Sequence, residues 1–247
     1  MTGVTGTLNL LKRADDVLGV LDALSEEKIK KLTLFEVDPK PAGRSPGLGK
    51  SPEIQEFVPQ ALELRENFNI PYWMSIFFVA TNSGKEIPER VLDSATFHVE
   101  TSTQKKVEIA TSSDLVKEID ATIALLPADY SLMVSSKVLT VEDEYKHVPM
   151  LDFRLKSTHS NHSVVSNVVR RLGLPGVVLD SGRSYHFYGA SLITDTELTQ
   201  FLAKALLFTP LIDYRWIAHQ LLEGACALRV SPGGAEQITP RVIEIVA

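Results

Sequence analysis

Two stretches of alternating side-chain character constrain the fold more than any other feature of the chain. They are VPMLDFRLK at 148–156 and LDSGRSYHFYGASLI at 179–193. Because side chains alternate along a strand, each stretch has one apolar or aromatic face and one polar face. The polar rows contain Asp152, Arg154, Lys156, Ser184 and His186. Ionisable groups in a row on otherwise apolar strands indicate a place for binding or chemistry.

The segments around these strands predict how the two meet. The predicted elements are a helix over 160–172, a strand over 176–180, a turn at 181–183, helices over 194–208 and 213–224, and a strand over 225–231. If the helix at 213–224 is treated as an insertion, the order is βαββαβ, as in ferredoxin-like and RNA-recognition-motif (RRM) folds. The first and third strands are central neighbours in that pattern. Asp152 and His186 are therefore expected side by side on an open sheet face, with both helices on the other face.

The N-terminal half is predicted to form an α/β module. Its predicted elements are a helix over 8–24, a helix over 53–68 interrupted at Pro59, a strand over 71–80 covered on both faces, a hairpin over 95–110, a helix over 112–126, and a long strand or bent pair over 130–145. The fold class is α/β (α+β), with an α/β module at 1–145 and an RRM-like module at 146–247. No break in composition marks a linker, so the two modules are expected to form one body.

Composition limits where the protein is expected to reside and which partners it is expected to bind. The chain has 247 residues, a formal net charge of −6 and a single cysteine, Cys226. The net charge is negative, so the chain as a whole has no basic surface that would indicate nucleic-acid binding. A single cysteine cannot form a disulfide within the chain. The first residues lack the pattern of a signal peptide, and no apolar run approaches the ~20 residues of a membrane span. A cytoplasmic protein without membrane contact is expected, and its protein partners are unknown.

Three motifs in order resemble those of the archaeo-eukaryotic primase (primase-polymerase) superfamily. An Asp on the strand ending VPMLDFR resembles the Asp-x-Asp strand of that family. SGRSYHFY resembles its Ser-Gly-Arg…His hairpin, and LID at 211–213 resembles its apolar residue followed by Asp. ALRVSPGGAEQITPRVIEI at 227–245 is similar to its Arg-containing strand, short loop, Pro and final strand.

The resemblance implies roles for particular residues. Two-metal nucleotidyl transfer uses carboxylates to hold Mg²⁺ or Mn²⁺ against a triphosphate. Asp152 and Asp213 would be the metal ligands and, with His186, the catalytic residues. Nucleotide or nucleic-acid phosphate would be bound by His186, Ser181, Arg183, Arg229, Arg154 and Lys156. The implied partners are a nucleoside triphosphate or nucleic acid, in DNA replication or repair.

One position departs from the family pattern. The second acid of the Asp-x-Asp pair is Arg154 here, and a guanidinium cannot ligate a cation. Whether the chain is an enzyme therefore stays open. One hypothesis is a metal-dependent nucleotidyltransferase. A second is a catalytically degenerate member of the fold that binds nucleotide, nucleic acid or a protein partner.

The same residues also permit structural interpretations. Asp213 is well placed to cap the helix that follows it. His186 fits a buried structural histidine on an aromatic strand, and Asp152 fits an ion pair with Arg154 or Lys156. An unrelated ferredoxin-like protein with a coincidental motif order is the third hypothesis.

Overall fold

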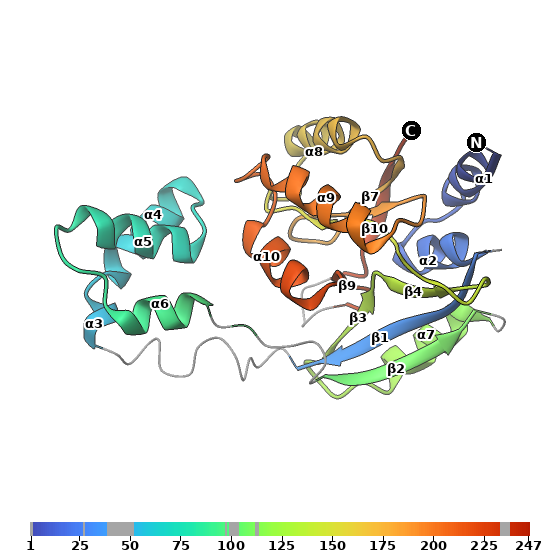
Figure 1. Cartoon of the computed structure of the whole chain (residues 1–247), viewed down its shortest axis with the longest axis horizontal. Coiled ribbons are helices and arrows are strands. Elements are labelled where there is room, and N and C mark those ends of the chain that lie inside the picture. Colours follow the sequence, from blue (N-terminus) through green and yellow to red (C-terminus); the bar gives the residue numbers. More distant parts are fainter. Residues whose placement is uncertain are drawn as a thin grey trace. The chain divides into compact units, whose positions relative to one another are not determined.

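A computed structural model describes residues 2–26, 28–38, 52–96, 98, 104–111, 114–232 and 238–247 (Figure 1). The chain divides into two compact units: unit 1 is Met1–Pro39 with Glu100–Ala247, and unit 2 is Lys40–Val99. Unit 1 combines helices with two antiparallel sheets, which confirms the mixed α and β class. The predicted division into modules at 1–145 and 146–247 stays a prediction.

A six-stranded sheet forms the first layer of unit 1. Its strands are β1 (Ile29–Val37), β2 (Lys105–Ala110), β3 (Ser131–Ser135), β4 (Lys137–Thr140), β5 (Tyr145–His147) and β9 (Ala227–Arg229). The order is β5-β4-β1-β3-β9, and β2 pairs with β1. β3 and β4 both pair with β1, so the predicted long strand or bent pair over 130–145 is a bent pair followed by the short strand β5.

Two helices cover one face of this sheet. The helices α2 (Val17–Ser25) and α7 (Leu115–Ala124) supply Leu21 and Ile119 to the same buried core as Leu32 and Leu34 of β1. Lys31 and Thr33 alternate with these leucines and so point to the opposite face. α1 (Thr2–Leu11) precedes α2, and Asp16 caps α2 by accepting from the backbone N–H groups of Leu18 and Gly19.

A four-stranded antiparallel sheet forms the second layer of unit 1. Its strands are β6 (Met150–Asp152), β7 (Gly176–Asp180), β8 (Tyr185–Gly189) and β10 (Arg241–Val246), in the order β10-β7-β8-β6. The helices α8 (His159–Leu172) and α9 (Asp195–Leu206) both contact the row that contains Phe187 and Glu244. Phe201 of α9 packs on Phe187, and Ser166 of α8 donates to Glu244. The prediction that both helices cover one face of this sheet is thus met.

The topology differs from the predicted βαββαβ sheet in its fourth strand. The strand predicted at 225–231 exists as β9, but it pairs with β3 in the other sheet, with Leu228 opposite Val134. The fourth place is taken by β10, which pairs with β7. The first strand, β6, is therefore an edge strand rather than a central one. Local sequence specifies a strand but not its partner, because pairing depends on long-range packing.

Unit 2 is a helical insertion with its own core. It contains α3 (Pro52–Gln55), α4 (Val58–Phe68), α5 (Tyr72–Asn82) and α6 (Glu89–Thr96). Phe57, Trp73, Ile76 and Val91 are buried in this core. Since its chain leaves unit 1 after β1 and returns before β2, unit 2 replaces the turn of an antiparallel hairpin.

Two predictions for the N-terminal half are wrong. The run at 71–80 is the helix α5 instead of a strand. Trp73, Ile76 and Ala80 recur at helical spacing on its buried side. An unbroken apolar run does not distinguish a buried strand from a buried helix. The segment 8–24 forms the separate helices α1 and α2, because the side chain of Asp16 begins a new helix there.

The predicted hairpin at 95–110 is only partly present. Its first residues belong to α6 and its second arm is β2, whereas residues 101–103 of its predicted turn at 101–104 lie outside the described residues. Ser112 and Ser113, where the next helix was expected to begin, also lie outside the described ranges, and Asp114 caps α7. Within the ranges given above, no helix is both long enough and apolar enough to cross a membrane.

Candidate functional site

The register of β6 and β8 places Asp152 directly opposite His186. The Oδ1 atom of Asp152 lies 3.9 Å from Nε2 of His186. The predicted neighbourhood of the two side chains is thus present. The predicted openness of the face is wrong, because His186 is 6% exposed and Met150 and Tyr188 on the same face are fully buried. The edge strand β9 of the six-stranded sheet contacts β6, and the charge of Arg229 on β9 acts on Asp152, His186 and Tyr188 of this face.

Asp213 joins this pair through the backbone. The chain after β6 runs beside the segment before α10 (Tyr214–Glu223), with a bridge between Phe153 and Ile212. The backbone N–H of Asp213 donates to the carbonyl oxygen of Asp152 at 3.1 Å. Oδ1 of Asp213 also accepts from the N–H groups of Arg215 and Trp216, so Asp213 caps α10 as well. Asp213 therefore caps the helix, as the structural interpretation predicted, and also lies next to Asp152.

The environment of Asp152 disfavours its charged form. Burial, together with the negative charge of Asp213, raises the pKa of Asp152 to about 7. A hydrogen bond from Ser184 and the charges of Arg229 and Arg183 act in the opposite direction. The Oδ1 atom is buried without a hydrogen-bond partner, and the side chain as a whole is 27% exposed. Such a carboxyl exchanges a proton near neutral pH and has an oxygen that lacks a partner.

His186 is neutral at ordinary pH. Burial, and then the charge of Arg229, lower its pKa to about 3. A neutral imidazole cannot act as a cation toward phosphate, but it donates one hydrogen bond and accepts another. Its Nδ1 atom is buried without a partner, as is Oδ1 of Asp152. Each of these two buried polar atoms needs a hydrogen-bond partner, which a ligand or water can supply in solution.

The Ser-Gly-Arg turn connects β7 to β8 beside this pair. Ser181 N–H donates to the carbonyl oxygen of Ser184, and the two hydroxyl oxygens are 3.2 Å apart. Gly182 has φ of +92°, and its N–H donates to Asp180. Arg183 is exposed, and its charge lowers the pKa of Asp152. The turn therefore holds one buried hydroxyl and one exposed cation close to Asp152.

Arg229 connects this turn to β9. Its guanidinium donates to three backbone carbonyl oxygens: Ser181 at 2.7 Å, Ile238 at 3.0 Å, and Ser231. Its charge also lowers the pKa of Asp152 and His186. Arg229 thus acts on the cluster as a fixed positive charge whose hydrogen bonds go largely to the backbone.

Arg154 and Lys156 lie beyond the end of β6. The strand stops at Asp152, and Arg154 N–H donates to the carbonyl oxygen of Leu211. The alternation predicted that Arg154 and Lys156 continue the row of Asp152 along one strand. This prediction is wrong, because the strand ends before them. Burial raises the pKa of Tyr214, and the charge of Arg154 acts in the opposite direction. Lys156 is exposed, and its carbonyl oxygen accepts from Asn161 of α8.

Tyr188 is a member of the cluster that the motifs did not single out. Its hydroxyl is fully buried without a hydrogen-bond partner. Burial raises the pKa of Tyr188, and the charges of Arg229 and Asp152 both act on it. The signal was present in the alternation, because Tyr188 follows Ser184 and His186 in the same row of β8.

The cluster contains two carboxylates that are candidate ligands of a divalent cation. In the described part of the chain, no group of three His, Cys, Asp or Glu side chains is arranged to hold a metal ion. Asp152 and Asp213 remain as a pair, and the unsatisfied Oδ1 of Asp152 is a free oxygen donor. Mg²⁺ is commonly bound by one or two carboxylates together with substrate phosphates. Asp152 and Asp213 would supply two carboxylates to one such cation, fewer oxygen donors than a two-metal centre needs.

Comparison with protein families agrees with this geometry. A family model described as archaeo-eukaryotic primase 1D-like (AEP-like) matches residues 111–239, more than half of the chain. The chain belongs to the archaeo-eukaryotic primase superfamily. The matched part of this primase-like chain includes Asp152, the Ser181 turn, His186, Asp213 and Arg229, whereas β1, unit 2, β2 and β10 lie outside it. No curated protein and no solved structure matches the chain significantly.

Proposed function

We propose that this primase-like chain binds the phosphates of a nucleoside triphosphate, or of nucleic acid, at the cluster of Asp152, Asp213, His186 and Arg183. The observation behind the proposal is the unsatisfied Oδ1 of Asp152, which lies 3.9 Å from Nε2 of His186 and is subject to the negative charge of Asp213. A buried carboxylate oxygen without a hydrogen-bond partner, next to a second acid and an imidazole, is typical of a binding site.

Each residue has a role in this proposal. Asp152 and Asp213 would hold one Mg²⁺ or Mn²⁺, which would neutralise phosphate charge and polarise the reacting phosphoryl group. Binding of the cation requires Asp152 to lose its proton. Neutral His186 would donate a hydrogen bond to a phosphate oxygen, and exposed Arg183 would supply a mobile cation. Ser181 and Arg229 would fix the shape of the turn.

Two forms of the proposal differ in chemistry. In the active form, the chain is a metal-dependent nucleotidyltransferase. In the degenerate form, it binds nucleotide or nucleic acid without transfer. Arg154 favours the degenerate form, because it replaces a second acid and leaves one carboxylate pair where the two-metal reaction needs more oxygen donors.

Calorimetric titration of ATP with and without Mn²⁺ tests the proposal. We expect binding by the wild type that requires Mn²⁺ and is lost in Asp152→Asn, which removes the charge but keeps the shape. The matched control is Asp120→Asn, an exposed acid on α7. Equal binding by Asp152→Asn and the wild type, or none by either, would contradict the proposal. Primer extension by the wild type then separates the active form from the degenerate one.

A further inference from the structure

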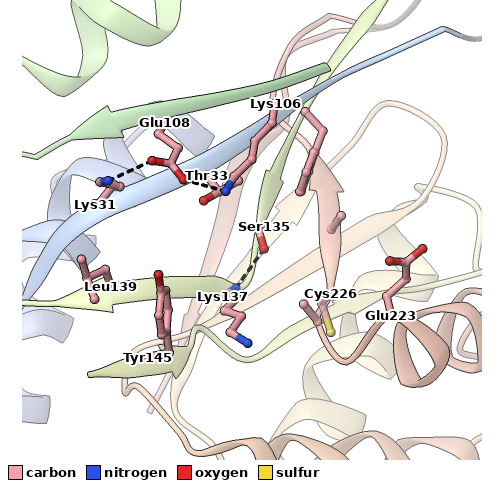
Figure 2. Close-up of a pocket in the computed structure, with 13 residues that line it drawn as sticks. Lys31, Thr33, Lys106, Glu108, Ser135, Lys137, Leu139, Tyr145, Glu223 and Cys226 are labelled. Carbon is pink, nitrogen blue, oxygen red and sulfur yellow. Dashed lines mark hydrogen bonds and ion pairs between the residues drawn. The ribbon is translucent and has the colours of Figure 1, made fainter. Parts of the chain in front are cut away.

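A cavity lies on the face of the six-stranded sheet to which Lys31 and Thr33 point (Figure 2). Its volume is about 580 Å³. The lining includes Lys31 and Thr33 of β1, Lys106 of β2, Lys137 of β4 and Tyr145 of β5. None of the residues that line it belongs to the Asp152 cluster. Small-molecule sites have volumes of roughly 300–1,000 Å³, so a ligand of nucleotide size fits.

Two lysines at one end of the cavity share a single carboxylate. Nζ of Lys31 lies 2.8 Å from one oxygen of Glu108, and Nζ of Lys106 lies 2.6 Å from the other. Hydrogen bonds from both lysines lower the pKa of Glu108 to about 2, so Glu108 is ionised at neutral pH. The three groups together have an excess positive charge. An ammonium group has three donors, so each lysine has hydrogen bonds left for an anion.

The other end of the cavity is aromatic. Nζ of Lys137 lies 5.3 Å from the centre of the Tyr145 ring, and Tyr145 is 65% exposed. Phe35 and Leu139 add apolar surface between the two ends. Figure 2 shows Lys31 and Lys106 on one side of the cavity and Tyr145 and Lys137 on the other. A flat ring can pack on Tyr145 while an attached phosphate reaches the lysines.

The charges favour a small ligand over a polymer. Lys31, Lys106 and Lys137 line the cavity with Glu108 and Glu223, which leaves the wall only slightly basic. Grooves that bind single-stranded nucleic acid are uniformly basic along the backbone path. A mixed wall instead suits a molecule with one anionic end and one neutral aromatic end.

We propose that this cavity is a second ligand site that takes a nucleoside phosphate without metal, separately from the Asp152 cluster. The phosphate oxygens accept from Nζ of Lys31 and Lys106 and compete with Glu108. The base packs on Tyr145, and Lys137 moves from the ring toward the phosphate or sugar. This goes beyond the function proposed above, because no carboxylate pair and no cation take part.

Titration of ADP in the presence of EDTA tests this site. We expect the wild type to bind, and we expect Lys106→Gln and Tyr145→Leu each to weaken binding about tenfold, as loss of one charge-assisted or aromatic contact does. Both side chains are exposed, so both variants should fold. Lys105→Gln is the matched control, since Lys105 is the neighbour on β2, pairs with Glu36, and does not line the cavity.

Asp152→Asn separates this proposal from the preceding one. ADP binding in EDTA should survive in Asp152→Asn, whereas Mn²⁺-dependent ATP binding should not. The second site is refuted if ADP does not bind without metal, or if its affinity is the same in Lys106→Gln and Lys105→Gln. It is also refuted if a short single-stranded oligonucleotide binds far more tightly than ADP with the same dependence on Lys106 and Tyr145.

Discussion

The candidate site depends on how single residues respond to burial. Asp152 and His186 face each other on neighbouring strands, yet burial raises the pKa of one and lowers that of the other. Both shifts favour the neutral forms, so the pair is not an ion pair near neutral pH. A ligand with a positive centre would restore the charge of Asp152. That coupling makes the ionisation of Asp152 the most informative property to measure.

Substitution of Asp152 should change how stability depends on pH. The folded-state pKa of about 7 is above the ordinary 3.8, so the native state holds this proton more tightly than the unfolded chain does. The stability contributed by the carboxyl is present below the unfolded value and is lost as pH rises through the folded value. The free energy of unfolding of Asp152→Asn, relative to that of the wild type, should therefore increase by on the order of 2 kcal/mol between about pH 5 and about pH 8.

Urea unfolding of both proteins at the two pH values measures this difference. Asp120→Asn, on the exposed side of α7, should show no such change with pH. A constant difference between Asp152→Asn and wild type across the range would mean that Asp152 is ionised throughout.

Substitution of Arg229 should lower the stability of the fold more than it weakens ligand binding. Its guanidinium holds the carbonyl oxygens of Ser181, Ser231 and Ile238 together. Lys cannot reproduce the planar fork, so Arg229→Lys should lower the free energy of unfolding by about 1–3 kcal/mol. Thermal unfolding measures the loss, and Arg241→Lys on the exposed edge of β10 is the control. Equal melting temperatures for the two variants would show that the three hydrogen bonds contribute little.

At the scale of elements, the sequence predicts local structure well and strand partners poorly. The strands at 176–180 and 185–189, the cap Thr194 and the C-terminal Gly173 of α8 all follow from local chemistry. Local chemistry does not predict that β9 joins the other sheet, because the apolar side chain of Leu228 fits either sheet equally well. The neighbourhood of Asp152 and His186 was predictable because both strands alternate, whereas the burial of their face depends on β9.

Gly176 shows how closely the elements of the second sheet pack. A Cβ atom at this position would lie 2.6 Å from Cε2 of Phe187 and would also overlap the carbonyl oxygen of Tyr188. Backbone atoms cannot move aside cheaply, so Gly176→Ala should cost at least ~2 kcal/mol. Gly6→Ala is the control, since Gly6 has no neighbour within 4 Å of its Cβ position and is helical. The free energy of unfolding of Gly6→Ala should increase by ~0.5–1 kcal/mol. Chemical unfolding should give opposite signs for the two variants.

At the scale of the whole molecule, unit 2 is an addition to a hairpin that could close without it. Glu36 and Lys105 are paired neighbours at the end of β1 and the start of β2. Unit 2 has its own core, so unit 1 loses no core residue when unit 2 is removed.

Replacement of residues 38–103 by an Asn-Gly turn should leave unit 1 folded, because Val37 and Gln104 would then flank a two-residue turn in the existing register of β1 and β2. Such a turn suits the twist of an antiparallel hairpin. The melting temperature should stay within about 5 °C of the full chain, and ADP binding in EDTA should be unchanged. Calorimetry measures both quantities. An unfolded or aggregated product would show that unit 2 supports unit 1 directly.

The placement of β9 and β10 has a consequence for how the chain acquires its shape during synthesis. β9 completes the edge of one sheet and β10 the edge of the other, and both come from the last part of the chain. Until these residues leave the ribosome, β3 and β7 each lack one of their two partner strands and the face containing Asp152 is not covered. At ~5–20 residues per second, that exposure lasts for seconds after β6 has emerged. The nascent chain is thus open to strand-to-strand association at β3 and β7 until β9 and β10 have been made.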